Sequence, residues 1–302
     1  MYSVALKQKQ YATYILSDQS SGARLEVVPE RGGIITQWDV DDTHILYMDT
    51  ERFKDPSKSV RGGIPILFPI CGNLPDDTYQ VDGKSYQLVQ HGFARVLPWM
   101  VSDRGVKSDA VADEAGAFLQ LTLTSNDQTR RVYPFDFEAQ FTYRLKGRSL
   151  YIEQRFTNKS ESPMPFSTGL HPYFNVSSSA ADKSQLQLTI PATQYADNMT
   201  KTEQSFDGDF DWSVPEIDAA FRPVSAQQAA VKDPVRGVDI SLRYDESFTT
   251  VVFWTVAGKG FYCLEPWSAP RNALNTGTDL LMLAPKETKT LMVTLSATTK
   301  TA

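Results

Sequence analysis

The sequence FEAQFTYRLKGRSLYIEQRF, residues 137–156, decides the fold class. On either side of Lys146-Gly147, apolar side chains alternate with polar ones, first over Phe137–Leu145 and then over Leu150–Phe156. A period of two over this length is typical of strands that bury one face. The stretch therefore predicts two antiparallel strands joined by a tight turn.

Short apolar or alternating stretches recur along the rest of the chain. Thr78–Leu88 reads as a hairpin around Asp82-Gly83, a strong two-residue turn signal. Glu51–Ser59 has room for one helical turn, and no amphipathic helix of three turns is visible. We predict an all-β fold, a large antiparallel β-sandwich that forms one domain over residues 1–302. The other predicted strands are Leu25–Glu30, Ile34–Val40, His44–Met48, Phe118–Thr124, Gln185–Ile190, Val238–Tyr244, Thr249–Val256, Gly260–Leu264 and Thr290–Ser296.

Composition and charge exclude several classes of partner. The 302 residues carry a net charge of −6, whereas nucleic acids and anionic membranes attract a positive surface. There is no apolar run of about 18 residues that could span a bilayer, and Met1–Gln10 lacks the apolar core of a signal peptide. Two cysteines, Cys71 and Cys263, do not make a disulfide framework. We expect a cytoplasmic protein without a nucleic-acid or membrane partner.

A second stretch, RGGIPILFPICGN at Arg61–Asn73, has too much glycine and proline for a helix and too many apolar residues for a solvated loop. Gly62-Gly63 permits backbone angles that a side chain forbids, and the two prolines favour extended geometry. We expect a rigid, partly buried connection. Together with the nearby Gln90–Arg95, it would bring Arg61, His91 and Arg95 near one place.

Two later motifs carry groups that can exchange protons. In Thr168–Asn175, His171 precedes a proline and is framed by aromatic residues. In Phe261–Trp267, Glu265 ends an apolar strand, and a carboxylate in that position is paired, hydrogen-bonded or functional. Each feature taken alone is more often structural. Their joint occurrence with the two arginines predicts a functional site.

The motifs taken in order resemble the aldose 1-epimerases, or mutarotases. They are Arg-Gly-Gly-Ile-Pro with Phe-Pro, Gln-His-Gly-Phe-Ala-Arg followed by Trp99, Leu-His-Pro-Tyr-Phe-Asn, and Leu-Glu-Pro-Trp. The chain is most similar to the glucose-6-phosphate 1-epimerase, or hexose-6-phosphate mutarotase, branch, and the similarity runs from about Glu26 to Ser296. The resemblance implies the galactose mutarotase-like supersandwich fold.

The resemblance also implies roles for single residues. His171 matches the family's general acid and Glu265 its general base. Matches to substrate-binding positions are Arg61, Gln90, His91, Arg95 and Asp218. The implied reaction interconverts the α and β anomers of a hexose 6-phosphate. It needs neither a cofactor nor a metal, and we expect a monomer or weak homodimer.

The residue types suit that chemistry. Mutarotation takes a proton from the anomeric hydroxyl and delivers one to the ring oxygen, so it needs one base and one acid. A carboxylate and an imidazole can supply both near neutral pH, and arginine forks match phosphate oxygens. Three aromatic side chains could either stack on a hexose or belong to the core: Phe93, Tyr173 and Trp267.

Three other functions remain open from the sequence. Pro-Tyr-Phe-Asn after His171 is as similar to the free-sugar mutarotases, so the substrate could be an unphosphorylated aldose. A non-catalytic carbohydrate-binding protein could share the fold, although it would not need both His171 and Glu265. A metalloenzyme could use His91, His171 and Glu265 as ligands, although the close histidine spacing of one strand or helix is absent.

Overall fold

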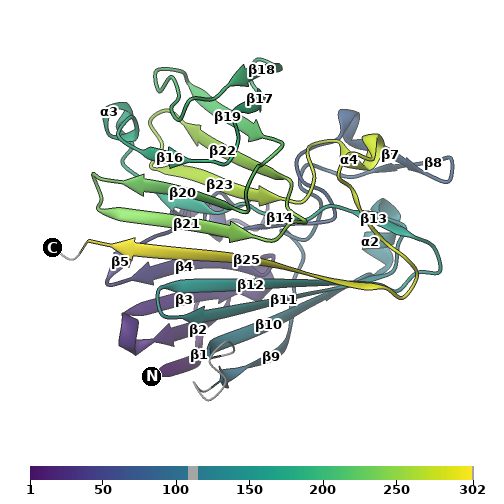
Figure 1. The fold of residues 1–302 in the computed structure, drawn as a ribbon. Helices are drawn as coiled ribbons and strands as arrows, with labels where there is room; N and C mark the ends of the chain where they lie inside the picture. The colour runs from purple at the N-terminus through teal and green to yellow at the C-terminus, as the bar shows by residue number, and fades with distance from the viewer. Residues whose placement is uncertain (108–114, 301–302) are drawn as a thin grey trace.

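Figure 1 shows the chain in a computed structural model that describes residues 1–107 and 115–300. Antiparallel strands dominate the described residues, and every pairing between named strands is antiparallel. The predicted all-β sandwich is confirmed. That residues 1–302 form one domain stays a prediction.

One of two eight-stranded sheets in the described chain has the strand order β16-β20-β21-β25-β12-β11-β10-β9. Its neighbouring strands β11 and β12 are the hairpin predicted from residues 137–156. The strands are β9 (Met100–Lys107), β10 (Gly116–Thr124), β11 (Phe137–Lys146), β12 (Ser149–Asn158), β16 (Gln187–Thr189), β20 (Gln228–Asp233), β21 (Val238–Tyr244) and β25 (Thr288–Thr299).

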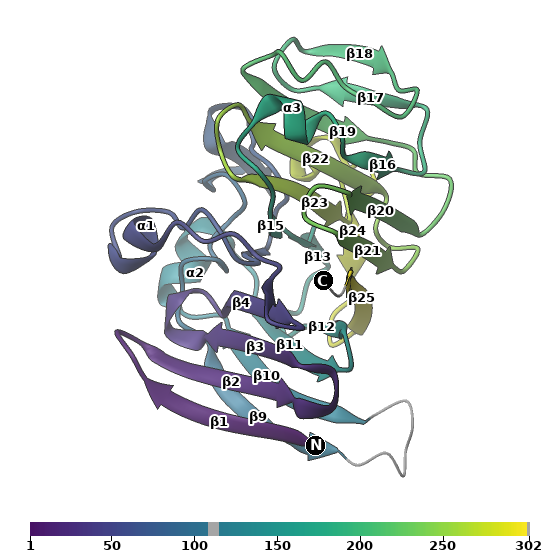
Figure 2. The same ribbon diagram turned by 90° about the vertical axis from the view of Figure 1, so that its left-hand side faces the viewer.

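Two further sheets pack against this one. A five-stranded sheet in the order β1-β2-β3-β4-β5 lies against β9, β10 and β11 (Figure 2). It comprises β1 (Tyr2–Gln8), β2 (Ala12–Asp18), β3 (Ala23–Val28), β4 (Ile34–Val40) and β5 (Thr43–His44). The other sheet, in the order β18-β17-β19-β22-β23-β14-β6 with β15 also beside β23, carries the site described below. Its strands are β6 (Ile66–Leu67), β14 (Gly169–Leu170), β15 (Tyr173–Asn175), β17 (Gln194–Asp197), β18 (Thr202–Ser205), β19 (Glu216–Phe221), β22 (Thr250–Val256) and β23 (Phe261–Trp267).

Small elements complete the described chain. There are two two-stranded sheets among the described residues. One pairs β7 (Thr78–Val81) with β8 (Lys84–Gln87), and the other pairs β13 (Met164–Phe166) with β24 (Leu281–Leu283). The helices are short: α1 (Thr50–Lys54), α2 (Asp127–Val132), α3 (Ala180–Lys183) and α4 (Ala273–Thr276). Within residues 1–107 and 115–300, none of them has the length and apolar character that a bilayer crossing requires.

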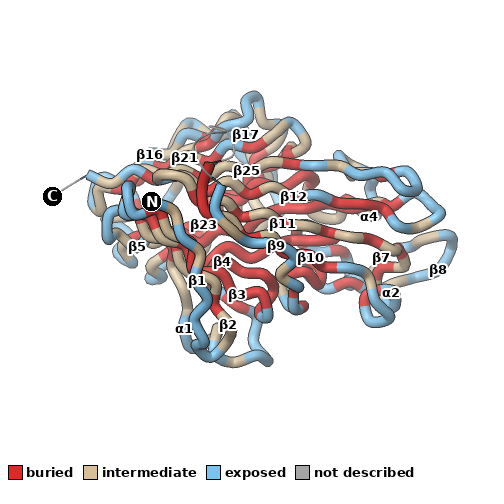
Figure 3. The backbone as a smooth tube through the Cα atoms, turned by 90° about the horizontal axis from the view of Figure 1, so that it is seen from below, coloured by how far each residue is buried: buried red, intermediate tan, exposed pale blue. Residues whose placement is uncertain are grey.

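Core packing connects the β11–β12 hairpin to the Arg61–Asn73 stretch. Buried residues follow the central strands, whereas exposed ones gather in the loops, at α1 and along edge strands such as β1 and β9 (Figure 3). Phe68 is fully buried, and its ring lies 5.0 Å from that of Phe156 and 5.1 Å from that of Phe137. Burial of such rings is the main source of stability in a β-sandwich of this kind.

The Arg61–Asn73 stretch is buried more deeply than predicted, because every residue from Gly62 to Gly72 is buried. It runs beside the later histidine motif, and three backbone bonds tie the two segments together. The amide N–H groups of Tyr173, His171 and Ser167 donate to the carbonyl oxygens of Gly63, Pro65 and Pro69 at 2.9, 3.1 and 2.9 Å. These bonds hold the stretch against the histidine motif, and its rigidity stays a prediction.

Gly63 is expected to tolerate no side chain. Its φ is +63°, and a Cβ atom there would lie 2.1 Å from the Ile35 carbonyl oxygen. We expect Gly63→Ala to lower the free energy of unfolding by more than about 3 kcal/mol, since backbone must move. Gly83→Ala is the matched control, because Gly83 also has a positive φ but open space around it. It should cost only about 1–2 kcal/mol. Urea unfolding of both variants tests this, and equal losses would contradict it.

The predicted strands are largely present, with differences at several positions. The strand expected at His44–Met48 is wrong beyond His44, where only isolated bridges at Leu46 and Met48 continue the pairing. The strand expected at Gln185–Ile190 shrinks to β16. The sequence analysis missed β1, β2, β9, β17, β18, β19 and β20, as well as short strands near the site.

Candidate active site

The register of the sheet places His171 opposite Glu265. On the segment next to β23, Gly169 faces Trp267 and Tyr173 faces Cys263. In an antiparallel ladder the position midway between these pairs is His171 against Glu265. Residues that face each other across strands project from the same side of the sheet. The acid and the base proposed from the sequence thus share one face.

A cavity of about 270 Å³ opens on that face and collects all seven predicted site residues. This volume is near the lower end for small-ligand pockets. The predicted residues in its wall are Arg61, Gln90, His91, Arg95, His171, Asp218 and Glu265, and the rest of the wall is Ser59, Val60, Tyr173, Glu216, Val252, Trp254, Trp267 and Arg271.

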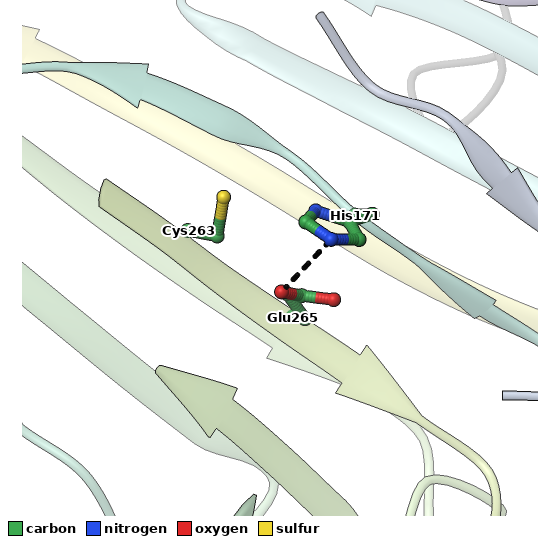
Figure 4. Close-up of side chains that lie close together, drawn as sticks. All are labelled: His171, Cys263 and Glu265. Carbon is green, nitrogen blue, oxygen red and sulfur yellow. Dashed lines mark ion pairs between the residues drawn. The ribbon is translucent and has the colours of Figure 1, made fainter. Parts of the chain in front are cut away.

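His171 and Glu265 are in direct contact at the base of this cavity. Nε2 of His171 lies 3.4 Å from Oε1 of Glu265, as the dashed line in Figure 4 marks. The two residues are 7% and 1% exposed. The other carboxylate oxygen accepts a hydrogen bond from Nε1 of Trp267 at 3.0 Å. The His171 ring stacks on Tyr173 with centroids 4.7 Å apart. Both groups are therefore held in fixed orientations.

Burial shifts the pKa of each member of this pair against its charged form. Loss of solvent raises the pKa of Glu265 well above its usual range, and the Asp218 charge raises it further. Loss of solvent also lowers the pKa of His171 well below its usual range, as does the positive charge of Arg95. Because the two groups are in direct contact, they titrate as a unit.

His91 presents one ring nitrogen to the cavity in a defined protonation state. Its Nδ1 accepts a hydrogen bond from the Gly72 N–H at 3.1 Å, so the neutral ring carries its proton on Nε2. Its own backbone N–H donates to the Gly72 carbonyl oxygen at 2.7 Å. The φ of His91 is +66°, a left-handed conformation. This backbone arrangement turns the ring toward His171, with centroids 5.4 Å apart.

Removal of His91 is expected to make the protein less sensitive to acid. Burial lowers the folded-state pKa of His91 well below its usual range, so below about pH 6.5 only the unfolded chain takes up the proton. Stability is therefore lost as the pH falls through this window, by up to about 1.4 kcal/mol per pH unit. We expect the His91→Asn variant to lose less stability between pH 7 and 5.

The difference in pH-dependent stability between the wild type and the variant reports on His91, because His171 and Glu265 titrate in both proteins. Asparagine tolerates the left-handed conformation, and its side-chain oxygen can accept the Gly72 N–H. Urea unfolding at pH 7, 6 and 5 gives the measurement. Parallel pH curves for the wild type and the variant would mean that His91 takes up its proton as readily in the folded protein as in the unfolded chain, and would contradict the lowered pKa.

Arg61 and Arg95 give the cavity positive charge without acidic partners. Among the described residues, neither forms an ion pair. Arg95 is half-buried and donates a hydrogen bond to the Val60 carbonyl oxygen at 3.2 Å. Arg61 is exposed, and its guanidinium carbon lies 6.0 Å from the centre of the Trp254 ring. Two guanidinium groups at the wall of one cavity are suited to an anionic ligand.

Arg271, Trp254 and Glu216 are among the polar or aromatic cavity residues that the sequence analysis missed. Arg271 forms an ion pair with Asp218 at 2.9 Å. Trp254 donates through Nε1 to Glu216 at 2.7 Å, so the indole is fixed at the side of the cavity. Arg271 follows the Leu-Glu-Pro-Trp motif by only four residues, and that short distance was the available signal. Glu216 lies two residues before Asp218 on β19, hence on the same face.

The aromatic residues considered as sugar platforms divide into two groups. Tyr173 and Trp267 line the cavity, so their rings are in position to contact a ligand. Phe93 is instead a core residue, since its ring packs against Phe68 and Phe137 with centroids 6.0 and 5.8 Å apart. A sugar-stacking role for Phe93 is therefore wrong.

The residues with metal-ligand spacing differ from the set expected for a metalloenzyme. In the described part of the chain, the group with metal-ligand spacing is His171, Cys263 and Glu265, whose ligand atoms lie within 4.8 Å of one another (Figure 4). His91 is outside it. Burial raises the pKa of the Cys263 thiol well above its usual range, which disfavours the thiolate that a metal requires. Three arginines also line the cavity, and their charge opposes a divalent cation.

Comparison with known proteins gives a consistent result along the chain. The profile of the family described as aldose 1-epimerase matches residues 15–296. The crystal structure of the Slr1438 protein from Synechocystis sp. PCC 6803 is 46% identical and superposes with a TM-score of 0.91, over 99% of this chain and 100% of that one. A galactose mutarotase-like protein from Clostridium acetobutylicum shares the fold at 18% identity, with a TM-score of 0.81 over 99% of each chain. A protein from Cenchrus ciliaris named "Putative glucose-6-phosphate 1-epimerase" is 29% identical over 178 residues, 57% of this chain and 49% of that one.

Proposed function

Since this chain belongs to the aldose 1-epimerase family, we propose that it interconverts the α and β anomers of a hexose 6-phosphate. The family makes the protein an epimerase with a sugar as its small-molecule substrate. The observation that carries the proposed chemistry is the contact between His171 and Glu265 inside a cavity of sugar-binding size.

The proposed reaction is a reversible ring opening. Glu265 takes the proton of the anomeric hydroxyl while His171 donates a proton to the ring oxygen, which breaks the bond between that oxygen and C1. The resulting aldehyde turns about the C1–C2 bond. When the ring closes on the other face, His171 takes its proton back and Glu265 returns its own to the new anomeric oxygen. Charges and protons balance without any further reactant.

The phosphate specificity rests on Arg61 and Arg95. Neither guanidinium group forms an ion pair among the described residues, and a phosphate can accept charge-assisted hydrogen bonds from both, whereas a neutral sugar does not require them. The name of the Cenchrus ciliaris relative agrees with this assignment. A free aldose is the second candidate, because His171-Pro172-Tyr173-Phe174-Asn175 is equally similar to free-sugar mutarotases. The cytoplasmic location and the monomeric or weakly dimeric state stay predictions.

Polarimetry with freshly dissolved α-anomers tests the function. We expect the protein to accelerate equilibration of α-glucose 6-phosphate above the spontaneous rate, and to act much more weakly on α-glucose and α-galactose. Acceleration of the free sugars alone would favour the second candidate. Binding of the sugars without acceleration of any aldose would make the protein a non-catalytic carbohydrate-binding member of the fold.

A further inference from the structure

Asp218 and Arg271 form an ion pair in the wall of the cavity. Nη2 of Arg271 lies 2.9 and 3.3 Å from the two carboxylate oxygens of Asp218, and Nδ2 of Asn198 donates to one of them at 2.9 Å. The two charged side chains are only 16% and 24% exposed. Most of the hydrogen-bonding capacity of the carboxylate is therefore used within the protein, which fixes its orientation.

Arg271 is also held at its other contacts. Its Nη1 donates to Oδ1 of Asn73 at 3.1 Å, and its guanidinium carbon lies 5.5 Å from the centre of the Trp267 ring. Its Cγ atom occupies the space beside Gly72, where a Cβ atom would come within 2.3 Å of it. Arg271 thus touches the residue whose indole N–H holds Glu265, and the glycine whose N–H holds His91.

We propose that Arg271 is a positioning residue of the reaction, which neutralises and orients Asp218 so that Glu265 works beside a compensated charge. This inference rests on the proposed function. Arg271 acts on the base through Asp218 and Trp267, and no contact between Arg271 and the reacting atoms is required. The sequence motifs that suggested the function do not include this residue.

The charges around Glu265 explain why the compensation matters. Asp218 raises the pKa of Glu265, whereas Arg271 and Arg95 lower it, as does the hydrogen bond from Trp267. Loss of Arg271 alone would leave the Asp218 charge uncompensated and make Glu265 harder to ionise. The titratable and charged groups around Glu265 on the surrounding elements are Arg61, Cys71, His91, Arg95, His171, Tyr173, Glu216, Asp218, Cys263 and Arg271.

The experiment is a charge cycle read out by pH profiles. We compare kcat/KM for α-glucose 6-phosphate from pH 5 to 9 in the wild type, Arg271→Met, Asp218→Asn and the double variant. The acid limb of the pH profile, where Glu265 becomes protonated, should move to higher pH by about one unit in Arg271→Met and to lower pH in Asp218→Asn. It should return close to the wild-type position in the double variant. Arg271→Lys keeps the positive charge, so its acid limb should shift less than that of Arg271→Met.

The design separates this inference from the proposed function. The substrate phosphate takes up a proton near pH 6, but it does so equally with every variant, so the differences report on the protein. A wild-type protein that accelerates no aldose would overturn the proposed function itself. An active wild type whose acid limb stays in place in Arg271→Met would overturn only the inference. If Arg271→Met fails to fold, an unmoved limb in the near-isosteric Asp218→Asn variant would overturn it as well.

Discussion

Replacement of Glu265 by glutamine is expected to lower kcat by about 10²–10⁴-fold, the usual contribution of one proton-transferring group. The amide cannot take the anomeric proton, so ring opening loses its base. Glutamine has nearly the same shape as glutamate, and its carbonyl oxygen can still accept the Trp267 N–H that now reaches Oε2 at 3.0 Å. The fold should therefore remain, and the measurement is the anomerisation rate above background in parallel with a thermal unfolding curve.

His171→Asn should cause a loss of the same order, and the double variant should be little worse than either single one. The two residues act as one unit across a 3.4 Å contact, and the effects of such residues are far from additive. His44→Asn is the matched control, because His44 is exposed and lies away from the cavity walls. Retention of most of the activity in either active-site variant would remove the proposed acid–base pair.

The second large effect is expected at Arg61. A hydrogen bond to a charged group contributes about 1.5–3 kcal/mol, so Arg61→Met should lower kcat/KM for the phosphorylated hexose by about 10–100-fold. The loss should appear mainly in KM. Arg61 is exposed and has no acidic partner among the described residues, so its removal leaves no buried charge behind.

The control for Arg61→Met removes the same charge elsewhere. Arg131 is exposed and outside the cavity, so Arg131→Met changes the net charge equally without touching the site. It should have little effect on KM. Arg95→Met should weaken phosphosugar binding too, although it also breaks the bond to the Val60 carbonyl oxygen. An Arg61→Met variant that loses activity equally on the phosphorylated and the free sugar would contradict phosphate recognition by Arg61.

The sequence predicts the fold class well because its signal is local. The alternation in residues 137–156 needs only neighbouring residues to be recognised, and the structure has β11 and β12 there. Missed strands lack that signal. In the edge strand β1 (Tyr2–Gln8), only two alternate residues are partly buried, and the other five are exposed. β19 (Glu216–Phe221) has two acidic residues on the face where a buried strand would have apolar ones.

The candidate site likewise has residues that local motifs predict and residues that only long-range contacts reveal. Motifs identify His171 and Glu265, but the pairing of Gly169 with Trp267 that sets them face to face is a long-range property. Arg271 lies outside the motifs, and its position depends on Gly72 and Asp218, which are far from it in the chain. Residues that act through contacts of this kind are found from coordinates, since nothing in their immediate sequence marks them.

The face-to-face pairing of β23 with residues 169–173 also restricts how genes for such proteins can change. A one-residue insertion or deletion within either segment would turn the following side chains to the opposite side of the sheet. A change before Glu265 in β23 would point the carboxyl group into the core while the imidazole stayed at the cavity, and a change before His171 would do the reverse. Length variation between homologues should therefore be confined to connections outside these two segments, and shuffled or circularly permuted versions should keep both of them whole.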